Sequence, residues 1–210
     1  MNLLVGLGNP GTKHLSNRHN AGFMAIDAIQ HKYQFPIFRK KFLGYISEGF
    51  IEGDKVVLLK PNTFMNESGK SVVAAAKFFS LDSEKILVFH DDIDLYLGQI
   101  KVKFGGGYAG HNGLKSIGQL YNSNFGRVRI GIGHPGDKDK VIGHVLKDFL
   151  AADQRVIEHI FQAIAEALPS LLYNGNSEFM AKVAAVMNSK INKRDNRGNH
   201  GKKYVVKGLD

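Results

Sequence analysis

The sequence predicts an α/β protein with a single three-layer domain, in which a twisted, mixed β-sheet is flanked by helices. The main observation is that short apolar runs, typical of strands, alternate along the chain with segments of helical periodicity. The run 86–89 is continuously apolar, as in a strand buried in a parallel sheet. In addition, a chain of 210 residues can bury about 70% of its surface, enough for one sizeable core.

Strands are expected where short apolar or alternating runs end at turn residues, at 1–5, 42–50, 55–59, 86–89, 100–104 and 128–132. The first run leads at once into a loop of Gly, Asn and Pro. Gly53-Asp54 separates the second run from the third and is a hairpin signal.

Helices are expected where apolar residues recur every three or four positions, at 20–33, 66–79, 112–121, 153–167 and 177–187. In the first of these, Phe23, Ile26 and Tyr33 lie near one face, and in the second Val72 and Ala76 are in register. Neither an internal repeat nor a mid-chain linker interrupts this order.

Charge is the informative part of the composition. The chain has 28 Lys and Arg against 19 Asp and Glu, a net charge of +9, which indicates a polyanionic partner. The segment 188–210 holds seven basic and two acidic residues, so we expect a folded domain over 1–187 and a basic, flexible tail over 188–210. The tail either holds nucleic acid loosely or has no role.

The sequence contains no cysteine, which excludes disulfides, thiolate metal sites and a cysteine nucleophile, and fits a cytoplasmic protein. It also lacks the long apolar stretch of a membrane span and the features of a signal peptide. The letters of Gly6-Leu7-Gly8-Asn9-Pro10-Gly11 match a dinucleotide fingerprint. We reject that interpretation because Pro10-Gly11 forces a turn where the fingerprint needs a helix.

Four groups of polar residues are candidates for chemistry. The first is Asn9 with Arg18-His19-Asn20, in the loop after the first strand, where α/β sheets place their sites. The dipole of the following helix disfavours an imidazolium and so helps to keep the His19 ring neutral, as a general base requires. The alternative is a surface or capping histidine.

The second candidate is His90-Asp91-Asp92 with Asp94, directly after the buried run 86–89. Three interpretations stay open: a carboxylate that orients a histidine, a metal site, and a solvated acidic turn.

The third candidate is the segment 61–66, which ends in Phe64-Met65-Asn66. Asn66 is either a helix N-cap or, with its exposed neighbours, a ligand contact.

The fourth candidate is basic. Alternation places Lys101 and Lys103 on one face of a strand, and Arg127 and Arg129 on one face of another, so we expect an outward basic face suited to phosphate. The glycine run 105–107 ahead of a helix offers backbone N–H groups to an anion, or is a plain loop.

In this order the motifs resemble those of bacterial peptidyl-tRNA hydrolases, and together they span residues 1 to about 187. The matching stretches are 5–11 (VGLGNPG), 18–23 (RHNAGF), 60–66 (KPNTFMN), 90–91 (HD), 105–107 with 110–114 (GGG and GHNGL), and 131–136 (GIGHPG).

The resemblance implies a monomeric, metal-free and cofactor-free esterase. Such enzymes cleave the ester between a peptide and the 3′ ribose of tRNA, recycling tRNA for translation. It implies that His19 is the general base, that Asp91 orients it, and that Asn9 distinguishes N-blocked from free aminoacyl esters. The contacts to the peptide and the 3′ CCA end would be Phe64, Met65, Asn66 and Asn112, and the clamp on the 5′ phosphate would be Lys103 and Arg129.

The chain departs from the family pattern at His14, where the usual residue is a substrate-contacting tyrosine. His14 either stacks more weakly or adds a second titrating group near His19. Two rival functions remain: a metal-dependent phosphohydrolase using His90, Asp91 and Asp94, and a non-catalytic RNA-binding relative.

Overall fold

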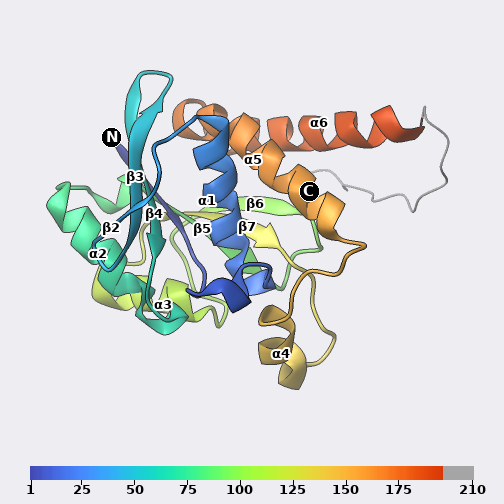
Figure 1. Cartoon of the computed structure of the whole chain (residues 1–210), viewed down its shortest axis with the longest axis horizontal. Coiled ribbons are helices and arrows are strands. Elements are labelled where there is room, and N and C mark those ends of the chain that lie inside the picture. Colours follow the sequence, from blue (N-terminus) through green and yellow to red (C-terminus); the bar gives the residue numbers. More distant parts are fainter. Residues whose placement is uncertain (196–210) are drawn as a thin grey trace.

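The computed structural model describes the backbone of residues 1–195 and the side chains of residues 1–189. Seven strands form one sheet in the order β2-β3-β4-β1-β5-β7-β6 (Figure 1). Their bounds are β1 Asn2–Gly6, β2 Arg39–Lys41, β3 Gly44–Ile51, β4 Asp54–Pro61, β5 Ile86–Asp92, β6 Ile100–Phe104 and β7 Gly126–Gly131. β1 is parallel to β4 and β5, and β5 is parallel to β7. The remaining pairs are antiparallel, so the sheet is mixed as predicted.

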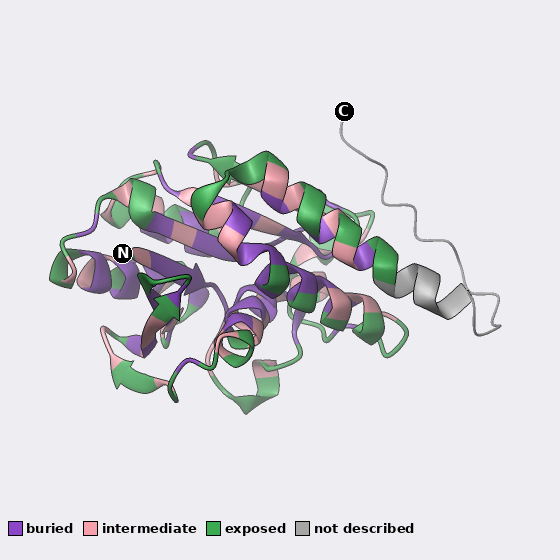
Figure 2. Cartoon of the chain, turned by 90° about the horizontal axis from the view of Figure 1, so that it is seen from above, coloured by how far each residue is buried: buried purple, intermediate pink, exposed green. Residues whose placement is uncertain are grey.

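Helices cover both faces of the sheet and complete the three layers. Their bounds are α1 Ala21–Lys32, α2 Ser68–Phe78, α3 Asn112–Leu120, α4 Val141–Val145, α5 Gln154–Tyr173 and α6 Asn176–Asp195. One face carries α1, α5 and α6, and the other carries α2 and α3 (Figure 1). The central strands are buried between these layers, whereas the helices expose their outer faces (Figure 2).

The core is split by the sheet into two apolar clusters. Along β1, Leu4 packs on the side of α1 and α5, whereas Leu3 and Val5 pack on the side of α2 and α3. This alternation follows from the two-residue period of a strand. A strand with apolar residues on both faces must lie inside the molecule, and β1 is accordingly central in the sheet.

The structure corrects several details of the expected elements. The hairpin between β3 and β4 turns at Glu52-Gly53, one residue earlier than predicted. Both residues have positive φ, 48° and 89°, as a type I′ turn requires. The expected strand 86–89 continues to Asp92. Neither β2, whose residues are all basic, nor the five-residue α4 was predicted.

The boundary expected at residue 188 falls inside a helix, because α6 continues to Asp195. The rest of the expected tail, 196–210, lies outside the described residues. Within the described part of the chain, no helix combines the length and apolar character needed to cross a membrane.

Candidate active site

The carboxyl ends of three parallel strands meet at one edge of the sheet. β1 leads into Asn9, β4 leads into the turn that holds Met65, and β5 ends with Asp91 and Asp92. α1 and α2 follow β1 and β4 on opposite faces of the sheet. Open α/β sheets bind ligands at the carboxyl edge of the strands, where the following helices diverge in this way.

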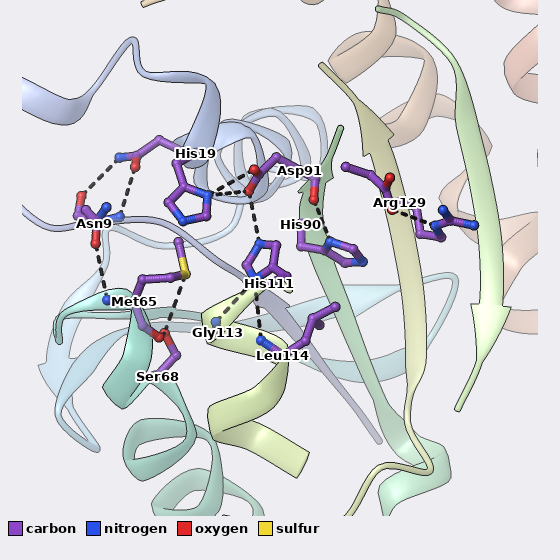
Figure 3. A network of polar contacts seen from close by, with 12 residues as sticks. Asn9, His19, Met65, Ser68, His90, Asp91, His111, Gly113, Leu114 and Arg129 are labelled. Atoms are coloured by element: carbon purple, nitrogen blue, oxygen red, sulfur yellow. Dashed lines mark hydrogen bonds and ion pairs between the residues drawn. The ribbon is translucent and has the colours of Figure 1, made fainter. Parts of the chain in front are cut away.

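His19 and Asp91, which are 72 positions apart, form the centre of the site (Figure 3). His19 lies in the 3₁₀ turn Arg18–Asn20 that precedes α1. Its Nδ1 is 2.8 Å and 2.9 Å from the two oxygens of Asp91. An ionised carboxylate only accepts hydrogen bonds, so Nδ1 carries the proton and donates it. The Nε2 atom of His19 is therefore the basic nitrogen.

His111 is a second donor to the same carboxylate. Its Nε2 lies 3.1 Å from Asp91 Oδ1, and its Nδ1 accepts from the backbone N–H groups of Gly113 (3.1 Å) and Leu114 (3.4 Å). His111 thus caps α3 and holds Asp91 with its other nitrogen, which fixes its neutral tautomer. Sequence reasoning gave His111 no role. The available signal was its position directly before a predicted helix, but the usual caps are Ser, Thr, Asp and Asn.

Burial and charge act in opposite directions on this pair. Burial alone would raise the pKa of Asp91, but His19 and His111 outweigh burial, so that pKa lies well below its usual range. Burial alone would lower the pKa of His19. The charge and hydrogen bond of Asp91 outweigh burial and raise the pKa of His19 above 6.5.

Asn9 is held so that one group of its side chain remains available. Its backbone N–H donates to Asn20 Oδ1 (2.9 Å), and Asn20 Nδ2 donates to the Asn9 carbonyl (3.0 Å). The Asn9 Oδ1 accepts from the Met65 backbone N–H (3.2 Å). The side-chain NH₂ of Asn9 is left as a donor for a ligand.

The remaining residues expected to contact substrate differ in exposure. Phe64 is 72% exposed, and Asn66 and Asn112 are also exposed. Met65 is buried and packs in the core on the α2 side. His14 is partly buried, and its Nδ1 lies 2.8 Å from Asn17 Oδ1.

A cleft of about 230 Å³ runs from His19 and Asp91 to the basic residues of β6 and β7. Lys103 and Arg129 both line it. The Arg129 Nε donates to Asp92 Oδ2 (2.7 Å), which holds one edge of the guanidinium and leaves the other edge for an anion.

Arg127 corrects the expected outward basic face. It also lines the cleft, but it is 2% exposed, and its guanidinium donates to the carbonyls of Gly106 (2.8 Å), Gly107 and Ser123 (3.2 Å). The outward charge of this face comes from Lys101, Lys103 and Arg129. Arg127 instead anchors the glycine loop.

His90 is buried, and its Nδ1 donates to the Asp91 carbonyl (2.7 Å). In the described residues, the one group whose ligand atoms come close enough for a metal ion is His19, Asp91 and His111, within 4.8 Å of one another. The set required by the rival phosphohydrolase hypothesis, which includes Asp94, does not converge in this part of the chain.

Comparisons with known proteins agree with this architecture. The family model described as peptidyl-tRNA hydrolase matches residues 3–194. A peptidyl-tRNA hydrolase of Ruegeria pomeroyi is 51% identical over 184 residues, which cover 88% of this chain and 77% of that protein. A peptidyl-tRNA hydrolase of Beijerinckia indica is 50% identical over 187 residues, which cover 89% of this chain and 94% of that protein.

A crystal structure of peptidyl-tRNA hydrolase from Acinetobacter baumannii superposes with a TM-score of 0.82 at 40% identity. The match covers 87% of this chain and 94% of the crystal structure. Fold and similarity together define a carboxylic ester hydrolase with a mixed α/β sheet. More particularly, the chain belongs to the peptidyl-tRNA hydrolase family, and its activity is the hydrolysis of peptidyl-tRNA. The predicted fold class and the predicted family are both confirmed.

Proposed function

We propose that His19 is the general base of this hydrolase and that Asp91 is its orienting partner. The observation that carries the proposal is the bond of 2.8 Å from His19 Nδ1 to Asp91, which makes Nε2 the unprotonated nitrogen of the neutral ring, on a residue that lines the cleft. A neutral imidazole with one nitrogen committed to a carboxylate is the arrangement that general-base catalysis by histidine uses.

The reaction follows from this assignment. The His19 Nε2 takes a proton from water as the water oxygen bonds to the ester carbonyl carbon. The resulting tetrahedral oxyanion collapses, and the bond from that carbon to the ribose 3′ oxygen breaks. The imidazolium returns the proton to the 3′ oxygen, which releases the peptide acid and free tRNA. Because an ester is cleaved more easily than an amide, water can attack it directly and no covalent nucleophile is needed.

The amides around the base supply binding. The free NH₂ of Asn9 is oriented by Met65 and Asn20 and suits the carbonyl of an N-blocked aminoacyl group. The exposed amide of Asn66 lies on the turn leading into α2, and that of Asn112 on the first residue of α3, where either can donate to the oxyanion. The exposed ring of Phe64 suits stacking on the 3′ end. We also assign Met65 and His14 to contacts with the substrate, although Met65 is buried and the Nδ1 atom of His14 is bonded to Asn17.

The far end of the cleft suits a phosphate. Lys103 brings a flexible ammonium, and Arg129 brings a guanidinium edge held in place by Asp92. A guanidinium held in this way binds phosphate with two parallel bonds. We assign these two residues to the 5′ phosphate of the tRNA. We propose that the protein acts as a monomer, as the family resemblance implies.

The test is release of free tRNA from an N-acetyl-aminoacyl-tRNA by wild type and by His19→Ala. We expect the rate to fall by about 10²- to 10⁴-fold, the contribution of a general base, while tRNA binding persists. The matched control is His31→Ala, because His31 is exposed on α1. If His19→Ala keeps more than about a tenth of the wild-type rate, the base assignment is wrong.

A second comparison concerns the free amine. With an unblocked aminoacyl-tRNA, wild type should react much more slowly than with the acetylated form, and Asn9→Ala should narrow that difference. An undiminished preference in Asn9→Ala would remove Asn9 from substrate discrimination.

A further inference from the structure

The loop before His19 is fastened to the chain that follows α4. Residues 17 and 148 form an isolated antiparallel bridge. Three hydrogen bonds join the segments: Phe149 N–H to the Ser16 carbonyl (3.1 Å), Arg18 N–H to the Lys147 carbonyl (3.0 Å), and Asn17 Nδ2 to Asp148 Oδ1 (2.6 Å). We call these contacts between residues 16–18 and 147–149 the clasp.

The Arg18 side chain reinforces the clasp. Its guanidinium donates to the carbonyls of Lys147 (3.3 Å) and Asp148 (2.7 Å) and lies 5.5 Å from the centre of the Phe149 ring. Arg18 is only 7% exposed. A guanidinium is seldom buried without partners, and the partners of Arg18 all lie in the segment that follows α4.

The clasp joins two parts of the candidate active site. On one side, the residue after Arg18 is His19 itself. On the other side lies α4, whose residues Val141, Ile142 and Val145 line the cleft. Phe149 is buried in the core on the α5 side, so the clasp is anchored to the rigid body of the domain.

We propose that Arg18, Asn17 and Asp148 are positioning residues for the reaction, because they fix the base and the α4 wall of the cleft relative to each other. The proposal rests on the assignment of His19 as the base. None of the three residues needs to touch substrate. Their effect on hydrolysis comes from holding His19 where its bond to Asp91 and its reach to water are both maintained.

The Asn17–Asp148 contact allows a specific test because the donor and the acceptor of its hydrogen bond are known. Asp148 only accepts, so the Asn17 NH₂ faces it, and the Asn17 Oδ1 accepts from His14 Nδ1. Asn17→Asp places two carboxylates against each other. Adding Asp148→Asn restores an amide–carboxylate pair with the direction of the hydrogen bond reversed, and His14 still finds an oxygen at residue 17.

The experiment measures kcat and KM on N-acetyl-aminoacyl-tRNA for the full chain carrying Asn17→Asp, Asp148→Asn or both. We expect Asn17→Asp to lower kcat by about 10-fold or more, since small displacements of a catalytic group are costly. KM should change much less. The double variant should return to within about threefold of wild-type kcat, because the restored pair repositions the base. The NMR signal of the His19 Nδ1 proton should weaken in Asn17→Asp and return in the double variant.

The matched control is Asn122→Asp, which makes the same chemical change in an exposed loop at the opposite edge of the sheet, just before β7. It should leave kcat unchanged. Melting temperatures of all variants show whether lost activity reflects unfolding. If Asn17→Asp is fully active beside an inactive His19→Ala, the clasp proposal is overturned and the base assignment stands. A double variant with a native melting temperature but no recovery of kcat also overturns the clasp proposal. An active His19→Ala would overturn the base assignment first.

Discussion

At the residue scale, Asp91 is the group on which the site depends, because one carboxylate accepts from both His19 and His111. An amide at this position replaces one carboxylate oxygen with an NH₂ donor. Because both histidines bond Oδ1 and His19 Nδ1 also lies 2.9 Å from Oδ2, the new NH₂ faces the Nδ1 atom of His19. A donor there favours the His19 tautomer with the proton on Nε2, the nitrogen that the proposed mechanism needs as base.

We therefore expect Asp91→Asn to lower kcat by about 10²-fold or more, through the wrong tautomer rather than through lost charge alone. The measurement is kcat on N-acetyl-aminoacyl-tRNA, with circular dichroism to confirm folding. A matched control is Asp94→Asn, three residues further along the chain. A folded Asp91→Asn enzyme within tenfold of wild type would argue against the tautomer mechanism.

The raised pKa of His19 sets the direction of the pH dependence of the rate. In the proposed mechanism His19 must be neutral to accept a proton, so we expect activity to be low while His19 is protonated and to rise as pH passes its folded pKa. Since Asp91 raises that pKa above 6.5, the acid limb of kcat/KM should have its midpoint above 6.5. The measurement is a pH profile corrected for spontaneous ester hydrolysis. A midpoint below 6.5 would contradict a raised pKa of His19 as the origin of the acid limb.

His90 makes stability depend on pH in a different way. Burial, with a smaller contribution from the neighbouring His111, holds the pKa of His90 well below 6.5. Below pH 6.5, His90 therefore takes up a proton in the unfolded chain but stays neutral in the folded chain. The free energy of unfolding falls as pH falls for this reason. His19, whose folded pKa is raised, contributes its stabilisation fully below pH 6.5 and so adds no slope there.

His90→Asn should therefore reduce the loss of stability on acidification from pH 6.5 to pH 5. One proton corresponds to about 1.4 kcal/mol per pH unit, which is the upper limit of the expected change in slope. Urea unfolding at several pH values measures it, with the exposed His31→Asn as control. Equal slopes in wild type and His90→Asn would contradict the argument.

At the scale of elements, the crossing of α1 over the sheet depends on Gly22. A Cβ built on Gly22 would lie 2.2 Å from the Phe89 carbonyl oxygen and 2.4 Å from the Leu7 nitrogen. The neighbours are backbone atoms, so α1 itself would have to move. Gly6, the first glycine of the rejected dinucleotide motif, serves the same approach, because a Cβ on Gly6 would lie 2.3 Å from the Gly22 carbonyl oxygen.

Gly22→Ala should destabilise the fold by about 3 kcal/mol, at the upper end for an overpacked core. It should also lower activity, since α1 begins just after His19. The control is Gly143→Ala in α4, where nothing lies within 4 Å of the added carbon. Chemical denaturation measures the free energy of unfolding of both variants. A Gly22→Ala variant as stable as wild type would contradict the packing argument.

The elements also show what the sequence reveals and what it hides. Strands and helices with an apolar side were predicted because burial leaves a periodic pattern. β2 was missed because an exposed edge strand, here Arg39-Lys40-Lys41, has no apolar face. α4 was missed because five residues hold too little periodicity. Arg127 was misjudged because alternation gives the face of a strand but not whether a loop covers that face.

The site was predictable only in part for a similar reason. The pairing of His19 with Asp91 depends on two strands that are adjacent in the sheet but distant in sequence, so it followed from the family resemblance and not from spacing. His111 and the clasp depend on tertiary contacts that leave no local pattern.

At the scale of the whole molecule, a net charge of +9 favours a polyanion in general, whereas Lys103 and Arg129 place two cations at the end of one cleft. Lys103→Glu with Arg129→Glu should raise KM. The double change should also reduce the slope of log KM against log salt concentration by about one for each lost phosphate contact. Lys32→Glu, an exposed change at the far end of α1, is the control. An unchanged salt slope would remove phosphate contact from this end of the cleft.

The anchoring of the glycine loop by Arg127 has a consequence for sequence variation. The guanidinium holds carbonyl oxygens, which every amino acid supplies, so the shape of the loop is insulated from the identity of several of its side chains. At Gly105, Gly106, Ala109 and Gly110 φ is positive, which favours glycine and limits substitution. Gly107 is exposed and has open space around an added Cβ, so a substitution there leaves the support in place. The rim of the cleft can therefore vary outside the four positive-φ positions, by natural drift or by engineering, without loss of its support.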